Sequence, residues 1–152
     1  AYGTLTLRRK FTNTTGITVT RLRFRVVDIT TSGSPNPSGN PQADLRVLNS
    51  ADASVETSGG TITVKGTVVE QPPTQDLGGG LNSSLTVQLP VGGLPNNSSI
   101  NVQFVLGVQQ EGNFRFFVNV EALPAPPTDS PGLAVQPSRK SDSMKADGAK
   151  EH

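Results

Sequence analysis

The chain has 152 residues, of which 33% are hydrophobic, and this length suits one domain with a buried core. The formal net charge of +1 gives the whole chain no long-range attraction for nucleic acid or anionic membranes. The absence of cysteine excludes disulfides, thiolate metal sites and cysteine nucleophiles. No apolar run approaches the roughly 18 residues that a membrane-spanning helix needs. We therefore expect no nucleic-acid partner and no membrane insertion.

Short runs of β-branched and aromatic residues alternate with polar ones and are separated by Gly, Pro, Asn and Ser, which predicts seven or eight strands. The expected strands cover residues 3–11, 17–30, 43–50, 54–57, 61–70, 81–90, 98–109 and 113–123. The short turns "SGG" and "QEG" predict that the fourth and fifth runs, and the last two, form hairpins. The segments 31–42 and 71–80, rich in Pro and Gly, are expected to be loops.

Turn signals at regular short spacing are typical of an antiparallel β-sandwich of the immunoglobulin-like or jelly-roll-like kind. We assign residues 1–124 to this domain, which is all-β. Alternation along each run predicts which side chains face the core. The predicted core residues are Leu5, Leu7, Leu22, Phe24, Val26, Ile62, Val64, Val68, Leu85, Val87, Leu89, Ile100, Val102, Phe104, Leu106, Phe114, Phe116, Val118 and Val120.

Residues 125–152 differ in composition, with repeated prolines, scattered charges and a single aliphatic cluster. Such a segment buries little surface of its own, so we expect an extended C-terminal tail. Within it, "GLAVQ" presents Leu133 and Val135, and this piece could add a strand to a sheet edge of its own domain or of a neighbouring subunit. The sequence begins with Ala1, which suggests removal of a signal peptide or a segment of a longer protein.

Residues that carry catalytic chemistry are scarce. The only histidine is His152, the last residue, and any serine–histidine–aspartate arrangement would have to rely on it. The stretch "NSADAS" reads as a turn rather than a calcium loop, and "DLGGGLNSS" lacks the Lys-Ser/Thr ending of a phosphate loop. We expect no enzyme activity, no metal site and no cofactor.

Basic side chains alternate with apolar ones in two runs. Arg21, Arg23 and Arg25 share one strand face, and Arg8 and Lys10 share a face of the first strand. If these strands formed a hairpin about "TNTTG", about five charges would gather on one sheet. That patch could bind an anionic polysaccharide or a carboxylate-rich subunit surface. We favour the other interpretation, a solvated face on which Thr, Asp and Glu neutralise the arginines.

Phe117 is the aromatic residue that breaks the pattern of the last strand. It lies on the face opposite Phe114 and Phe116, between Arg115 and Asn119. Such a residue is either covered by a loop or serves as a contact anchor for a subunit or for the tail. Both interpretations stay open from the sequence.

The stretches "LTLRRKFTNTTGITVTRLRFRVVDITT" and "GGGLNSSLTV…INVQFVLGVQQEGNFRFFVNVEALP" resemble β-sandwich modules found near the C-terminus of large secreted or cell-surface proteins of environmental bacteria. The resemblance covers about residues 3–124 and does not include the tail. It implies an extracellular location and a structural or adhesive role. It brings no catalytic or binding residues with it.

Taken together, these features predict a non-catalytic extracellular structural module. We expect it to be a subunit of a surface or filamentous assembly, a homo-oligomer held by sheet edges and the C-terminal tail. One alternative is an adhesive or carbohydrate-binding module, although the chain has one Tyr, no Trp and six Phe for stacking on sugars. A second alternative is a viral capsid or decoration protein, for which an all-β body with a tail is equally suitable.

Overall fold

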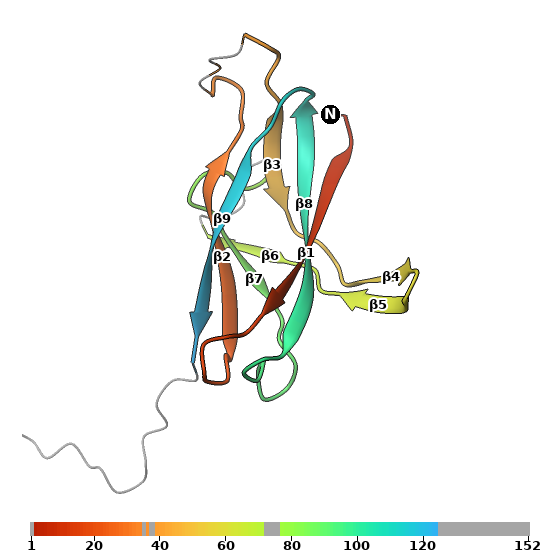
Figure 1. Cartoon of the computed structure of the whole chain (residues 1–152). Coiled ribbons are helices and arrows are strands. Elements are labelled where there is room, and N and C mark those ends of the chain that lie inside the picture. The colour runs from red at the N-terminus through yellow and green to blue at the C-terminus, as the bar shows by residue number, and fades with distance from the viewer. Residues whose placement is uncertain (1, 35, 37–38, 72–76, 125–152) are drawn as a thin grey trace, which may run out of the picture.

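The computed structural model describes residues 2–34, 36, 39–71 and 77–124 (Figure 1). The chain is all-β, as predicted, and the described residues form nine strands and no helix, so the predicted number of seven or eight strands was too low. The strands are β1 (Thr4–Thr12), β2 (Arg21–Ile29), β3 (Asp44–Leu48), β4 (Ala53–Thr57), β5 (Gly60–Val64), β6 (Val68–Gln71), β7 (Ser84–Val87), β8 (Ser99–Gln110) and β9 (Phe116–Leu123).

These strands form three antiparallel sheets. One has three strands in the order β1-β8-β3, and another has four in the order β6-β7-β2-β9. The third is the hairpin β4-β5, which projects sideways from the body (Figure 1). The predicted run 61–70 is divided between β5 and β6 because the chain leaves the hairpin at Lys65.

Of the two predicted hairpins one is wrong, and the hairpin of the first two strands that was considered for the basic residues does not form either. The hairpin β4-β5 is confirmed, with Ala53 opposite Val64 and Thr57 opposite Gly60. However, β1 pairs with β8 rather than with β2, and β9 pairs with β2 rather than with β8. Both sides of β8 are occupied, by β1 and β3, so the following strand crosses to the other large sheet. Side-chain alternation fixes which face of a strand is buried, but it does not identify the neighbouring strand.

The two larger sheets contribute side chains to one hydrophobic cluster. At its centre Phe24 of β2 meets Phe104 of β8 edge-to-face, with ring centroids 5.0 Å apart, and Phe11 of β1 lies 4.9 Å from Phe24. Phe24 is fully buried. Removing an aromatic side chain of this size from water contributes about 1.5–3 kcal/mol, so these three rings tie the two sheets together.

Four predicted core residues are exposed instead. Ile62 is 37% exposed because it lies on the projecting hairpin, and Val68 is 53% exposed at the start of the outermost strand β6. Phe114 precedes β9 and is 46% exposed. Val120 is 48% exposed although it is on the inner face of β9. Val64 is buried outside the main cluster, and the other predicted core residues are buried in the cluster or packed against it.

Candidate functional site

The exposed Val120 belongs to a groove between two sheet edges. β1 is the last strand of the three-stranded sheet and β9 the last of the four-stranded one, and both run toward the lower end of Figure 1. Within the described residues, the outer side of each strand pairs with no other strand. Their facing side chains enclose an open space that we call the β1/β9 groove.

The β1/β9 groove consists of two adjoining cavities that share Phe11 and Val120. The upper cavity has a volume of about 300 Å³ and the lower one about 240 Å³. The upper cavity is lined by Leu7, Arg9, Lys10, Phe11, Phe104, Phe116, Val118 and Val120. The lower cavity is lined by Phe11, Thr12, Asn13, Thr14, Thr15, Val19, Leu22, Leu94, Val120 and Ala122.

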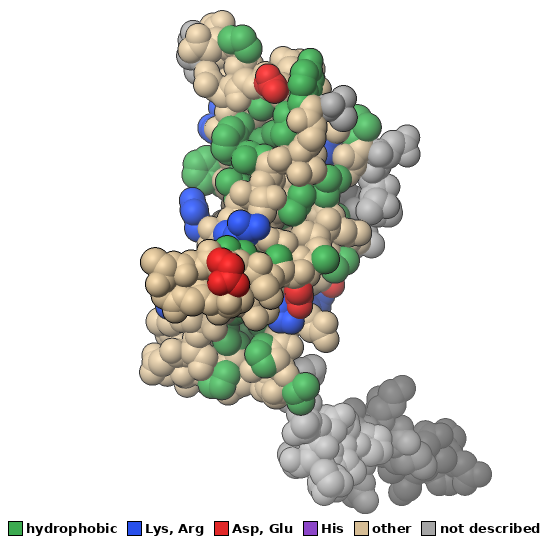
Figure 2. Space-filling model, turned by 90° about the vertical axis from the view of Figure 1, so that its right-hand side faces the viewer, with side chains coloured by type: hydrophobic (Ala, Val, Ile, Leu, Met, Phe, Trp, Pro, Cys, Tyr) green, Lys and Arg blue, Asp and Glu red, His purple; other side chains and the backbone are tan. Residues whose placement is uncertain are grey.

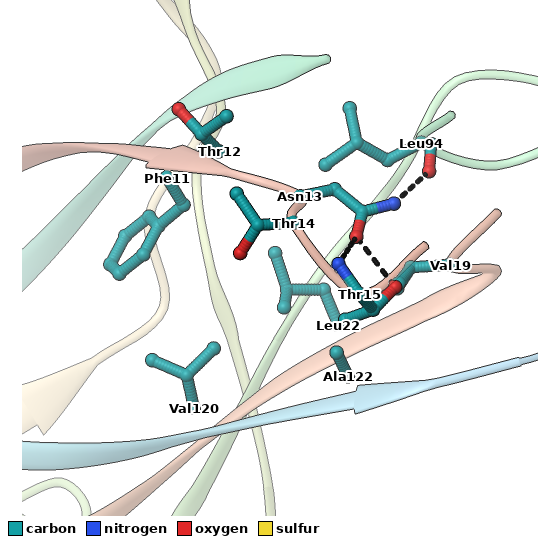
Figure 3. Close-up of a pocket in the computed structure, with 10 residues that line it drawn as sticks. All are labelled: Phe11, Thr12, Asn13, Thr14, Thr15, Val19, Leu22, Leu94, Val120 and Ala122. Atoms are coloured by element: carbon teal, nitrogen blue, oxygen red, sulfur yellow. Dashed lines mark hydrogen bonds between the residues drawn. The ribbon is translucent and has the colours of Figure 1, made fainter. Parts of the chain in front are cut away.

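The lower end of the groove is apolar. Phe11, Leu22 and Val120 point toward one space, which Ala122 and the turn after β1 border on the remaining sides (Figure 3). Leu22 is buried at the floor, whereas Val120 and Ala122 are exposed. Nonpolar groups on an open sheet edge are unusual because edges are normally protected by charge or by covering chain.

Asn13 fixes the turn that forms the rim of the lower cavity. Its side-chain amide donates hydrogen bonds to the carbonyl oxygens of Ile17 and Leu94, both at 2.8 Å. Its Oδ1 accepts from the backbone N–H of Thr15 at 3.0 Å and from the Thr15 hydroxyl at 2.7 Å (Figure 3). The side chain is buried, so every polar atom of this amide has a partner inside the protein.

The upper end of the groove carries an inward-facing cation, Arg9. Alternation along β1 places Arg9 on the same face as Leu7 and Phe11, and all three line the upper cavity. Its Nη1 donates to the carbonyl oxygen of Arg8 at 3.2 Å, and it has no ion pair within the described part of the chain. The sequence interpretation missed this residue because it considered only Arg8 and Lys10, the cations on the outward face of the same strand.

The three arginines of β2 each have a carboxylate partner. Arg21 lies 3.1 Å from Glu70, Arg23 Nε donates to Glu121 Oε2 at 2.6 Å, and Arg25 Nε donates to Glu121 Oε1 at 2.9 Å. The hydrogen bonds from Arg25 and then from Arg23 hold the pKa of Glu121 below its ordinary value. Two carboxylates therefore offset most of the positive charge of the three arginines, which is the kind of arrangement favoured from the sequence.

The patch of about five cations that a hairpin of the first two strands would have produced does not form. Arg8 and Lys10 belong to the three-stranded sheet, whereas the β2 arginines belong to the four-stranded sheet. Arg8 donates from Nε to Gln103 Oε1 at 3.1 Å on the neighbouring strand β8. Figure 2 shows basic side chains in small separate groups on the face that it presents.

The remaining predicted interaction residues have different outcomes. Phe117 is 57% exposed on the face of β9 that is turned away from the groove, so none of the described loops buries it. Its predicted role as a contact anchor stays a prediction. Leu133 and Val135 lie outside the described residues.

Acidic residues do not gather into a metal site within residues 2–34, 36, 39–71 and 77–124, where no group of three or more possible ligands occurs. Asp52 instead accepts hydrogen bonds from Lys65 Nζ at 2.6 Å and from the Gly66 N–H at 2.9 Å, and these bonds, the lysine first, lower its pKa. Asn49 Oδ1 accepts from the Val69 N–H, and the last two residues of "NSADAS" belong to β4, so this stretch connects β3 to β4 and is not the predicted turn. The described residues also include no helix of the length and hydrophobicity that a membrane crossing needs.

Comparisons with known proteins give no match for this chain among family models, curated proteins or solved structures. The resemblance to modules of bacterial surface proteins therefore stays a prediction.

Proposed function

We propose that the chain is a non-catalytic structural module that assembles through the edges bordering the β1/β9 groove. In this proposal the two larger sheets form a β-sandwich of the immunoglobulin-like or jelly-roll-like kind. The observation that carries it is the groove, in which exposed nonpolar side chains lie between two strands whose outer sides pair with no described strand. A sheet edge of this kind accepts an added strand through main-chain hydrogen bonds.

The two borders of the groove differ in their protection against such addition. β1 carries Arg9 on the inner face, and a charge in this position discourages the edge strand from pairing with a strand of another chain. β9 has Phe116, Val118 and Val120 on that face and no charge among them. We therefore place the accepting edge on β9, where an incoming strand would cover nonpolar groups as well as pair its backbone.

Addition of a strand from one subunit to the edge of the next is a heterologous contact. Such contacts build open filaments unless the rotation between subunits closes a ring or shell. This supports a subunit of a filamentous or surface assembly, for which we propose the extracellular location expected from the sequence. A viral capsid or decoration protein would use the same contact, and electron microscopy of the assembled chain would distinguish closed icosahedral symmetry from an open filament.

The proposed function is tested by replacing the nonpolar group at the centre of the groove. We expect the full-length chain to form oligomers whose mass rises with concentration, and Val120→Lys to shift that equilibrium toward the monomer. Burial of a valine side chain contributes about 1.5–3 kcal/mol, so the association constant should fall by roughly tenfold to a hundredfold. Sedimentation velocity over a concentration series measures this shift.

Val91→Lys is the matched control, because Val91 is fully exposed in the turn between β7 and β8. It should assemble like the unmodified chain. A full-length chain that remains monomeric at the highest soluble concentration would contradict the proposed function. Equal effects of the two lysines would show that the groove is not the contact.

A second candidate function, carbohydrate binding, is supported by a different surface. Tyr2 and Phe114 are 65% and 46% exposed and line one cavity of about 280 Å³, together with Glu111. Exposed aromatic rings beside a carboxylate are the groups that protein sites use to stack on sugar rings and bind their hydroxyls. A glycan screen with the full chain and with Tyr2→Ala tests this candidate, and the absence of any binding that Tyr2→Ala abolishes would exclude it.

A further inference from the structure

The lower, apolar end of the β1/β9 groove lies where β9 ends and the C-terminal tail begins. Ala122 lines the lower cavity, and β9 ends at Leu123. Val120 and Ala122 are two residues apart on one face, and the tail carries the matching pair Leu133 and Val135 at the same spacing. These two are the large aliphatic residues of the tail's only aliphatic cluster, "GLAV".

We propose that residues 129–136 of a second copy occupy the β1/β9 groove as a strand added beside β9 and parallel to it. This inference rests on the proposed function and names the partner of its accepting edge. Leu133 then lies opposite Val120, Val135 opposite Ala122, and Asp129 opposite Phe116, at the end of the groove where Arg9 is found.

Charge decides the direction of the added strand. In the parallel arrangement Asp129 shares the face of Leu133 and Val135 and comes beside Arg9, which has no ion pair among the described residues. An antiparallel strand that kept the two aliphatic residues at the lower end would instead bring Arg139 beside Arg9. Opposite charges at close range are favourable and like charges unfavourable, so the parallel direction is preferred.

The proline in this segment is compatible with an added strand. Proline has no N–H to donate, and within sheets it is restricted to positions where that donor is not needed. In the added strand, Pro131 would lie on the same face as Leu133 and Val135, and its missing N–H would be on the side turned away from β9. Because alternate residues of a strand direct their N–H groups to opposite sides, Ser130, Gly132 and Ala134 remain free to donate to β9.

The length of the chain assigns this strand to a second copy. A parallel strand with Asp129 opposite Phe116 must start at the upper end of β9, seven residues or about 23 Å from Leu123 at 3.3 Å per residue. Six peptide steps join residue 123 to residue 129, and they span at most about 20–22 Å when fully extended. The tail of the same chain therefore falls short of this position, whereas the tail of a neighbour has no such restriction.

Cysteine crosslinking tests the partner and the register together, because the chain has no cysteine of its own. Full-length Val120→Cys and full-length Leu133→Cys are mixed and treated with a short thiol-reactive crosslinker, and peptide mass spectrometry identifies the joined residues. We expect a covalent heterodimer that joins position 120 of one chain to position 133 of the other. Val91→Cys mixed with Leu133→Cys is the control and should give no comparable product.

Each alternative result of this experiment overturns the inference in a recognisable way. If the chains assemble but positions 120 and 133 do not crosslink, the inference is wrong and the proposed function stands. If the double variant Val120→Cys/Leu133→Cys crosslinks within one chain while the mixture does not, the tail occupies its own groove. If neither variant assembles under conditions where the unmodified chain is also monomeric, the proposed function fails as well.

A charge exchange tests the direction of the strand. Arg9→Glu should weaken assembly by about fivefold, the effect of losing one partly exposed ion pair, and adding Asp129→Arg to it should restore assembly. Arg8→Glu changes an outward-facing neighbour on the same strand and should have a smaller effect. A double variant that assembles more weakly than Arg9→Glu alone would overturn the parallel arrangement.

Discussion

Two of the three arginines of β2 depend on one carboxylate. Glu121 accepts from Arg23 on one oxygen and from Arg25 on the other, across the pair of strands β2 and β9. Strand alternation predicted that the arginines share a face, and the general expectation of acidic neutralisation was correct. The identity of the partner was not predictable, because Glu121 is close to 100 residues away in sequence and the β2–β9 pairing was not foreseen.

Replacing this carboxylate should make stability depend less on pH. The pKa of Glu121 is lowered in the folded protein from its ordinary value of 4.5, so the unfolded chain binds the proton more tightly. The stabilisation is therefore fully present above about pH 4.5 and is lost as the pH falls through the lower folded value. We expect Glu121→Gln to be less stable than the unmodified chain at neutral pH and equally stable in acid, as measured by urea unfolding.

Glu111→Gln serves as the control, since Glu111 is exposed and has no ion pair among the described residues. Its stability should follow that of the unmodified chain at each pH. A stability loss in Glu121→Gln that persists unchanged into acid would show that the arginine pairs do not stabilise the fold.

Asn13 is the buried polar residue on which the rim of the groove depends. Asn13→Ala removes four hydrogen bonds and leaves the Leu94 carbonyl oxygen without this donor. We expect the free energy of unfolding to fall by about 1–3 kcal/mol because the turn loses these hydrogen bonds, although the Leu94 carbonyl oxygen still accepts from the Val19 N–H. Asn119→Ala, at an exposed position of β9, should change it by less than about 0.5 kcal/mol. Equal losses in chemical denaturation would refute this assignment.

At the scale of the strands, their presence and approximate limits were predictable, but their neighbours were not. The alternation in residues 98–109 and 113–123 identified β8 and β9, and the short turn between them favoured a hairpin. In the structure β1 and β3 already flank β8, so β9 pairs with β2 instead. The groove follows from that crossing, which leaves β1 and β9 as neighbouring edges of different sheets. Local sequence has no signal for such a long-range choice.

The glycine run before β7 gives a prediction about how the two large sheets are joined. Gly78 has a φ of +116°, and a Cβ added there would lie 2.6 Å from the Val47 carbonyl oxygen on β3. Gly78→Ala should therefore lower the free energy of unfolding by about 1–3 kcal/mol. A Cβ at Gly80, in the same run, meets nothing within 4 Å, so Gly80→Ala should have a much smaller effect. Similar losses for both variants in denaturant titrations would contradict this account.

At the scale of the whole molecule, composition and periodicity predicted an all-β chain, and the structure confirms it. Much of the core was also predictable, because buried positions such as Phe24 and Phe104 follow strict alternation. The exposure of Val120 was not, since it depends on an adjacent space that the fold leaves open. In the proposed assembly, this exposed strip of β9 is the surface that a strand of the partner subunit would cover.

The central claim is that the outer edge of β9 accepts a strand from another subunit. Amide hydrogen exchange of the full-length chain at low and high concentration tests it most directly, because an added strand protects the N–H groups with which it pairs. We predict that protection of β9 rises with concentration, while β6, the opposite edge of the same sheet, is unchanged. Assembly that proceeds with no change in the exchange of β9 would contradict the claim.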